Sequence, residues 1–198
     1  ISREYGSGGR LIGKLVAKEL EIPYYDKELI AMVAEQSGFS LDYVEETGEY
    51  SPTSSRLFNL AVENMYRQGM AFSSELPAAD QVQIVQNKTI NDIADQGPCI
   101  IIGRCADYIL RERTQCLHVF IHASMEHKKS RAVQYYGLDA EKAEKALKKR
   151  DKARAGHYRH YTGQTWGAVE NYHLCLDSGK FGIEGCADLI VRAAKAGQ

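Results

Sequence analysis

A glycine-rich segment near the start of the chain constrains the fold most strongly, because it lies between an extended segment and a helical one. Residues 3–10 read REYGSGGR, and apolar residues at 11, 12, 15, 16 and 20 follow at the spacing of one helix face. Backbone N–H groups of such a loop, with the positive end of the helix behind it, form a cradle for phosphate. The alternative is a tight strand-to-helix turn without a ligand. The position between a strand and an amphipathic helix favours the phosphate cradle.

This loop departs from the standard phosphate-loop pattern, G-x-x-x-x-G-K-[ST]. If Gly8 is the second glycine of that pattern, Arg3 stands where the first glycine belongs. Gly9 then replaces the lysine, and Arg10 replaces the serine or threonine that contacts a metal ion. The sequence therefore predicts a phosphate loop whose charged residues are rearranged.

Strand-like and helical segments alternate along the rest of the chain. This alternation predicts an α/β fold, a parallel sheet with helices on both faces. Strands are expected at 1–3, 22–25, 99–102, 116–122 and 174–176, and the principal helices at 10–20, 27–37, 78–96, 125–136, 140–161 and 182–195. We expect one domain over 1–198, with a core of 1–37, 78–136 and 170–198, a helical insertion at about 38–77 and a helical lid at about 139–168. Within the insertion, the stretch 47–56 is rich in Gly, Ser, Pro and Thr and predicts a mobile surface loop.

Charge and composition narrow the class of partner. The chain has 198 residues, a net charge of −1 and a pI of about 6.7, so no domain-wide basic field points to a nucleic acid. No run approaches the roughly 20 apolar residues of a membrane span. Five cysteines, an odd number without a C-x-x-C pair, predict buried free thiols in a reducing cytoplasm. We expect a cytoplasmic protein that binds neither nucleic acid nor membrane; the sequence predicts no oligomeric state.

Several charged residues directly follow predicted strands. In open parallel sheets, ligands bind at the carboxyl ends of the strands, so Gly6–Arg10, Asp26, Arg104 and Asp177 are expected to face one cleft. Asp26 could cap the next helix, or it could orient an acceptor phosphate or a metal-bound water. Arg104 could bind phosphate through its guanidinium fork, or it could be paired in the wall of the cleft.

A dense group of basic residues marks the segment 142–159. Such a run is commonly a solvated helix face, but here tyrosines and histidines are interleaved with the charges. Phosphoryl transfer needs cations that close over the transferred group and exclude water. We therefore predict Arg150 and Arg154 to be lid residues.

Four motifs together resemble the cytidylate kinase-like proteins, a branch of the P-loop nucleoside monophosphate kinases. They are SREYGSGGR at 2–10, YDKELI at 25–30, GRCADY at 103–108 and YTGQTWG at 161–167. The resemblance covers essentially the whole chain. It implies a three-layer P-loop NTPase fold with a five-stranded parallel sheet, a helical NMP-binding insertion and a helical lid. It also implies transfer of the ATP γ-phosphoryl group to a nucleoside monophosphate such as CMP or dCMP, or to a related small acceptor, with Mg²⁺.

The motifs and the resemblance together give the candidate site residues. The ATP-binding candidates are Gly6, Ser7, Gly8, Gly9, Arg10, Leu11 and Arg131. The catalytic candidates are Arg10, Asp26, Arg150 and Arg154. The acceptor-binding candidates are Asp26, Arg104, Asp107 and Asp151. Ser7 is a weak candidate ligand for the metal ion.

Two departures from the family pattern shape the functional alternatives. Gly9 stands where the catalytic lysine is expected, and Cys105 stands where the family has the aspartate that helps read cytosine. The leading hypothesis is a small-molecule kinase that uses ATP and Mg²⁺. The alternative is a nucleotide-binding regulatory protein that no longer catalyses.

Overall fold

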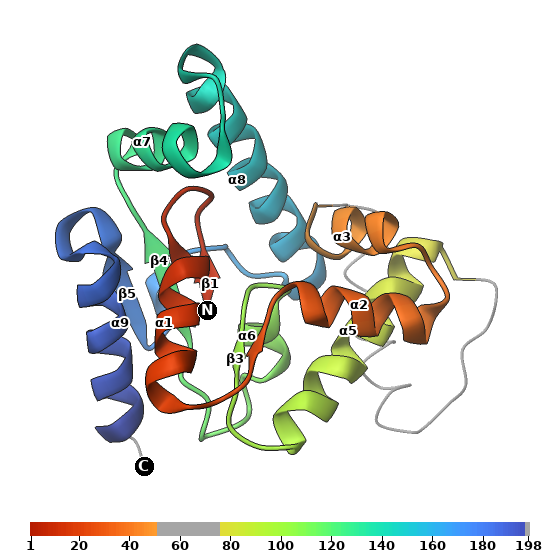
Figure 1. Ribbon diagram of the computed structural model, residues 1–198. Coiled ribbons are helices and arrows are strands. Elements are labelled where there is room, and N and C mark those ends of the chain that lie inside the picture. Colours follow the sequence, from red (N-terminus) through yellow and green to blue (C-terminus); the bar gives the residue numbers. More distant parts are fainter. Residues whose placement is uncertain (51–75, 197–198) are drawn as a thin grey trace.

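The computed structural model describes residues 1–50 and 76–196, which form an α/β fold with parallel strands (Figure 1). The strands are short: β1 (Ser2–Arg3), β2 (Tyr24–Tyr25), β3 (Ile100–Ile101), β4 (Val119–His122) and β5 (Leu174–Asp177). One sheet has the order β1-β4-β5, and the other pairs β2 with β3. In the first sheet, Ser2 lies opposite Phe120, and Phe120 lies opposite Cys175.

The prediction of one five-stranded sheet is therefore corrected to a three-stranded and a two-stranded sheet. The two sheets meet where β1 approaches β3. The Ile1 nitrogen donates to the Ile101 carbonyl at 2.7 Å, and the Gly103 nitrogen donates to the Ile1 carbonyl at 2.9 Å. Both hydrogen bonds involve Ile1, the residue directly before β1.

Helices surround both sheets, and two hydrophobic clusters hold them there. Their bounds are α1 (Gly9–Leu20), α2 (Lys27–Ser37), α3 (Leu41–Tyr50), α5 (Ala78–Asp95), α6 (Ala106–Ile109), α7 (Met125–Tyr136), α8 (Ala140–Thr162) and α9 (Ser178–Ala196), with a short 3₁₀ turn at Val169–Asn171. One cluster packs α1 and α9 against β4 and β5, through residues such as Ile12, Ile121 and Ile190. The other packs α2, α3 and α5 around β3, through residues such as Val33, Val44 and Ile90. The chain therefore has two core halves.

The predicted surface loop at 47–56 is wrong at its start, because α3 continues to Tyr50. Thr47 and Glu49 are buried, although the stretch reads as a polar turn. Position 48 of this helix is a glycine, and a Cβ there would overlap Nη1 of Arg104. The remainder of the predicted loop lies outside the described residues. The division into core, insertion and lid stays a prediction.

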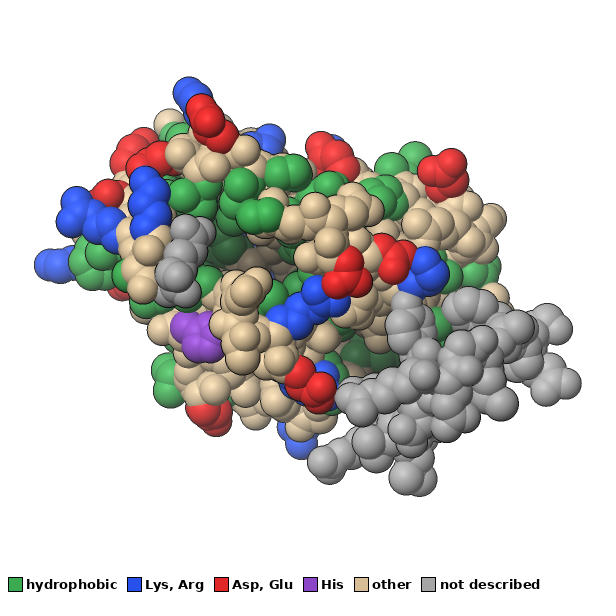
Figure 2. Space-filling view, turned by 90° about the horizontal axis from the view of Figure 1, so that it is seen from below, with side chains coloured by type: hydrophobic (Ala, Val, Ile, Leu, Met, Phe, Trp, Pro, Cys, Tyr) green, Lys and Arg blue, Asp and Glu red, His purple; other side chains and the backbone are tan. Residues whose placement is uncertain are grey.

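The helix α8 runs from α7 at the top of the molecule down to α3 (Figure 1). It is one continuous helix of 23 residues and contacts both α7 and α3. On the face shown in Figure 2, the described basic and acidic side chains are interspersed rather than separated by sign. Within residues 1–50 and 76–196, no helix combines the length and the apolar character that a membrane span requires.

Candidate active site

The loop between β1 and α1 has the backbone geometry of an anion cradle. Gly6 and Gly8 have φ angles of +83° and +85°, a region that side-chain-bearing residues rarely adopt. Ser7 is buried, and its hydroxyl donates to the Glu4 carbonyl at 2.8 Å within the loop. The helix α1 begins at Gly9, so its first N–H groups have no partner within the helix and carry its positive dipole end. The sequence prediction of a strand, loop and helix in this order is confirmed.

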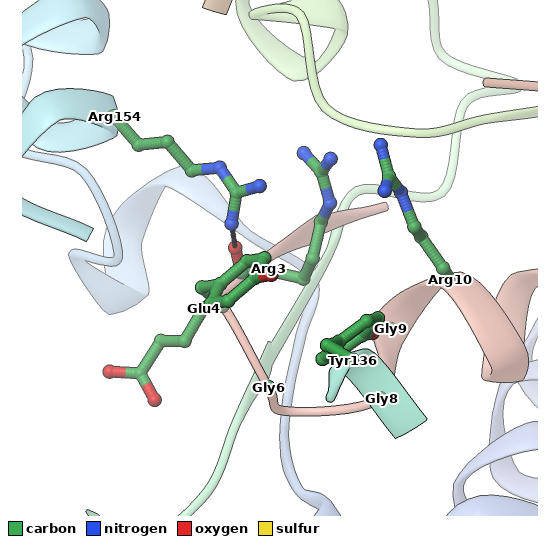
Figure 3. Close-up of a pocket in the computed structure, with 9 residues that line it drawn as sticks. Arg3, Glu4, Gly6, Gly8, Gly9, Arg10, Tyr136 and Arg154 are labelled. Atoms are coloured by element: carbon green, nitrogen blue, oxygen red, sulfur yellow. Dashed lines mark hydrogen bonds between the residues drawn. The ribbon is translucent and has the colours of Figure 1, made fainter. Parts of the chain in front are cut away.

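A narrow cleft, partly open to solvent, lies over this loop. Figure 3 shows the guanidinium groups of Arg3, Arg10 and Arg154 on one side of the loop, while Glu4 points away from them. The cleft is lined by Arg3, Glu4, Tyr5, Gly6, Gly8, Gly9, Arg10, Tyr136 and Arg154. A phosphate-binding loop and three guanidinium groups thus share one cavity.

No side chain fits at Gly9, where the sequence lacks the usual lysine. A Cβ atom at Gly9 would lie 2.6 Å from the Cβ and 2.9 Å from the Cγ of Arg3. Arg3 was not among the sequence-predicted site residues, yet its side chain lines the cleft beside the loop. The space next to Gly9 is therefore occupied by the side chain of Arg3, which extends from β1.

Arg3 and Arg154 converge on the carboxylate of Glu49, which α3 supplies. Arg3 pairs with Oε1 of Glu49, and the Nε of Arg154 lies 3.1 Å from the same oxygen. Arg154 also donates to the Arg3 carbonyl at 3.3 Å. Burial by itself raises the pKa of Glu49, but the two arginines outweigh it and hold that pKa well below its usual value. All three side chains are buried, so this is an interior ion cluster.

Arg10 and Asp26 form a second ion pair beside the loop. The Nε of Arg10 lies 2.8 Å from Oδ2 of Asp26, and its Nη2 donates to Oδ1 at 3.1 Å. Asp26 occupies the N-cap position of α2, but its carboxylate makes no capping hydrogen bond there. Of the two interpretations of Asp26, side-chain capping is therefore excluded, and the carboxylate faces the phosphate loop through Arg10.

Arg104 lies in the wall and anchors α3. Its Nη1 donates to the Val44 carbonyl at 3.1 Å and to Oε1 of Gln86 at 3.4 Å, and its Nη2 donates to the Glu45 carbonyl at 3.5 Å. The side chain is buried and is not among those that line the cleft. Of the two interpretations of Arg104, its contacts fit a side chain that is paired in the wall of the cleft. Its role in binding the acceptor stays a prediction.

Asp107 is partly buried in the first turn of α6. The Tyr158 hydroxyl donates to it at 2.7 Å. Burial raises the pKa of Asp107, while the hydrogen bond from Tyr158 opposes the rise. This carboxylate joins α6 to α8 and does not line the cleft.

Lys128 is a buried cation next to the loop, and the sequence analysis did not identify it as a site residue. Its ammonium lies 3.0 Å from Oε2 of Glu4 and 3.1 Å from Oδ2 of Asp151. Asp151 also accepts from the Tyr5 nitrogen at 2.6 Å. Burial lowers the pKa of Lys128, but the two carboxylates outweigh it, and the net shift is upward. The predicted acceptor residue Asp151 therefore links α8 to the phosphate loop.

Replacing Lys128 with methionine is expected to lower the free energy of unfolding by about 1–3 kcal/mol, since two partly buried carboxylates lose their shared donor. Urea denaturation measures the change. Lys129→Met is the matched control, because that side chain is exposed and its partner Glu144 is 3.6 Å away. The control should change the stability by less than about 0.5 kcal/mol. Equal stabilities for the two variants would contradict the assignment of Lys128 to this junction.

The other predicted residues surround the loop in different ways. Arg131 donates to the Ser7 carbonyl at 3.2 Å and to the Ser178 carbonyl at 2.8 Å, which ties the loop to α9. The guanidinium of Arg150 lies over the Tyr5 ring, 4.4 Å from its centroid. The Tyr5 ring also stacks on Tyr136, with the centroids 5.2 Å apart. Leu11 is 39% exposed on α1.

Similar solved structures identify the class of fold to which this chain belongs. A crystal structure of an uncharacterized protein from Eubacterium ventriosum matches with a TM-score of 0.69 and 25% identity, over 98% of this chain and 96% of that one. A shikimate kinase from Acinetobacter baumannii in complex with shikimate matches at 0.52 and 12% identity, over 100% and 92%. A shikimate kinase from Bacteroides thetaiotaomicron matches at 0.52 and 13%, over 98% and 95%. The fold is thus one that kinases with a phosphate loop share.

The cytidylate kinase-like family model matches residues 1–180, so the chain belongs to this family. Among curated protein sequences, none matches the chain significantly. Family membership confirms the resemblance that the four sequence motifs carried. Together with the kinase fold, it supports a kinase-type enzyme.

Proposed function

We propose that this protein is an ATP-dependent phosphotransferase that moves the γ-phosphoryl group of ATP to a nucleoside monophosphate such as CMP or dCMP, or to a related small acceptor. The observation that carries the proposal is the cleft itself, where a glycine loop at the head of α1 faces the guanidinium groups of Arg3, Arg10 and Arg154. Phosphoryl transfer depends on positioning and on neutralising charge more than on covalent help from the protein. In this proposal the glycine loop positions the phosphates, and the three guanidinium groups neutralise their charge.

In this proposal the loop residues Gly6 to Leu11 bind the ATP phosphates, and Arg131 fixes the shape of the loop from behind. Arg10 and Asp26 act as a pair, in which the carboxylate orients the guanidinium toward the transferred phosphoryl group. Arg150 and Arg154 bring positive charge from α8. Of the predicted acceptor residues, Asp26 faces the loop through Arg10. Arg104 and Asp107 would support the acceptor site from the wall, and Asp151 would support it by tying α8 to the loop.

Magnesium would enter with the nucleotide. Mg²⁺ usually keeps several waters and binds through substrate phosphates and one or two carboxylates, rather than through a dedicated protein cage. Among the described residues, no group of three histidine, cysteine, aspartate or glutamate side chains could hold a metal ion. The Ser7 hydroxyl donates to the Glu4 carbonyl, and Asp26 is paired with Arg10. The residues beside the loop thus fit an ion held mainly by ATP, which neutralises charge on its phosphates.

A coupled assay of ADP release tests this function. The purified chain is given ATP and Mg²⁺ with each nucleoside monophosphate, and then with a panel of small phosphorylatable metabolites. We expect turnover with at least one acceptor. Arg10→Gln should lower kcat/KM by about 10²–10³, the scale of losing one charge-stabilising group at a reacting centre. ATP binding without turnover for any acceptor would overturn the kinase assignment.

The position of Gly9 motivates a second candidate function, a regulatory protein that binds nucleotide without catalysis. The usual lysine is absent, and the loop has no room for a side chain there. Thermal-shift titrations with ATP, ADP and CMP, with and without Mg²⁺, separate the two. A regulatory protein should be stabilised by nucleotide yet release no ADP, and Arg104→Ala should weaken its binding alone.

A further inference from the structure

One carboxylate of the protein occupies the arginine-lined wall of the cleft. Arg3 and Arg154 both contact Oε1 of Glu49, and both arginines line the cavity above the phosphate loop. Glu49 comes from α3, which belongs to the core half opposite the loop. Two of the three arginines that line the cleft are therefore neutralised by an acid from the other core half.

A guanidinium group binds a carboxylate and a phosphate through the same fork of N–H donors. The groups around Glu49 thus suit an oxygen of a phosphate ester equally well. A phosphate monoester carries up to two negative charges and has three terminal oxygens, so it offers each arginine more than one carboxylate oxygen does. The surroundings of Glu49 therefore have the chemistry of a phosphate subsite that a resident carboxylate fills.

The backbone around this subsite is shaped for the arginines. A Cβ at Gly103 would overlap Nη1 of Arg3 and lie 3.0 Å from Oε1 of Glu49. Arg104 holds α3 in place through the Val44 and Glu45 carbonyls, one to two turns before Glu49. The positions of Arg3 and Glu49 thus depend on groups fixed to β1, β3 and α3, and are not chance contacts of surface side chains.

We propose that Glu49 occupies the subsite of the acceptor's anionic group, and that the acceptor's phosphate replaces the Glu49 carboxylate on Arg3 and Arg154. This rests on the proposed function and adds a residue that controls access to its site, because Glu49 must leave the two arginines before the acceptor's phosphate can bind them. A neutral acceptor has no charge with which to displace Glu49. Only counter-ions exchange in this step, and no covalent bond changes.

Isothermal titration of inorganic phosphate, CMP and cytidine into the wild type, Glu49→Gln and Glu46→Gln tests the proposal. Glu46 is exposed on the same helix and is the matched control. Glu49→Gln should bind phosphate and CMP at least about tenfold more tightly, since hydrogen bonds to charged groups are released for the ligand. Cytidine affinity should not change, Glu46→Gln should match the wild type, and adding Arg154→Gln should remove the gain. Equal phosphate affinity in a folded Glu49→Gln variant and the wild type would overturn it.

Hydrogen exchange on the wild type gives a test that needs no variant. Saturating phosphate or CMP should speed exchange of the amides near the end of α3, because Glu49 loses its arginine partners. Slower or unchanged exchange in α3 on binding would overturn the proposal. Turnover of CMP without any gain in Glu49→Gln would overturn this inference alone. A gain in phosphate affinity in a chain that transfers no phosphoryl group would overturn the kinase assignment and leave the anion subsite standing.

Discussion

Glu49→Ala is expected to lower the free energy of unfolding by about 3–5 kcal/mol, because it leaves two buried guanidinium groups without their shared counter-ion. Arg3 and Arg154 are both buried and both contact the lost oxygen. Urea denaturation followed by circular dichroism measures the change. Glu46→Ala, which removes an exposed carboxylate from the same helix, should stay within about 0.5 kcal/mol of the wild type.

The pH dependence of stability gives the same prediction a second readout. The pKa of Glu49 is held well below that of the unfolded chain, where a glutamate has a pKa of about 4.3. Its contribution is therefore fully present above about pH 4.3 and is lost as the pH falls through the folded-state pKa. The wild type should lose stability more steeply than Glu49→Ala on acidification. Parallel curves for the two proteins would contradict the assignment of Glu49 as the buried counter-ion.

Restoring the missing lysine with Gly9→Lys is expected to damage the site instead of improving it. The new Cβ would lie 2.6 Å from the Cβ of Arg3, closer than side-chain atoms pack. Overpacking of this kind costs typically about 1–3 kcal/mol. We also expect ATP affinity to fall, because the loop and Arg3 must both shift. Thermal unfolding and ATP titration measure the two effects.

Three variants separate crowding from the charge of the lysine. Gly9→Ala adds only the Cβ and should show most of the loss in stability. Combining it with Arg3→Gly should make this loss smaller than the sum of the two single changes, because the Cβ and Cγ of Arg3, which crowd the new Cβ, are both removed. Gly156→Ala is the matched control: a Cβ there meets nothing within 4 Å, so it should stabilise the helix by about 0.5–1 kcal/mol. Higher ATP turnover in Gly9→Lys would show that the loop can accept a lysine.

The order of strands and helices follows from local patterns, and this part of the fold was predictable. The phosphate loop was predicted because a glycine-rich segment lies between an extended segment and a run of apolar residues at helical spacing. The long helices at 78–96 and 125–136 were predicted within a residue of their observed bounds. The division into two sheets was not, because it depends on how β1 and β3 approach each other at Ile1. The pattern of apolar residues along a single strand does not predict how that strand approaches another one.

The candidate site was predictable where a residue follows a predicted strand or stands in the dense basic segment. Arg10 and Asp26 follow consecutive strands and were expected to face one cleft, and Arg154 was predicted from the basic segment. Glu49 was missed because glycine, serine and proline around it predict a loop, whereas tertiary contacts with Arg3 and Arg154 keep it in a buried helix. Lys128 was missed because it is one of several basic residues on α7, and only its burial distinguishes it.

The two ion pairs beside the loop span the boundary between the core halves. Arg3 and Arg10 belong to the half built on α1 and β4, whereas Glu49 and Asp26 belong to the half built on α2, α3 and β3. Any motion that draws the halves apart therefore separates opposite charges and leaves net positive charge at the loop. A polyanionic ligand stabilises such a separated state more than the closed one. In this molecule the electrostatic potential at the phosphate loop therefore becomes more positive as the distance between the two core halves increases.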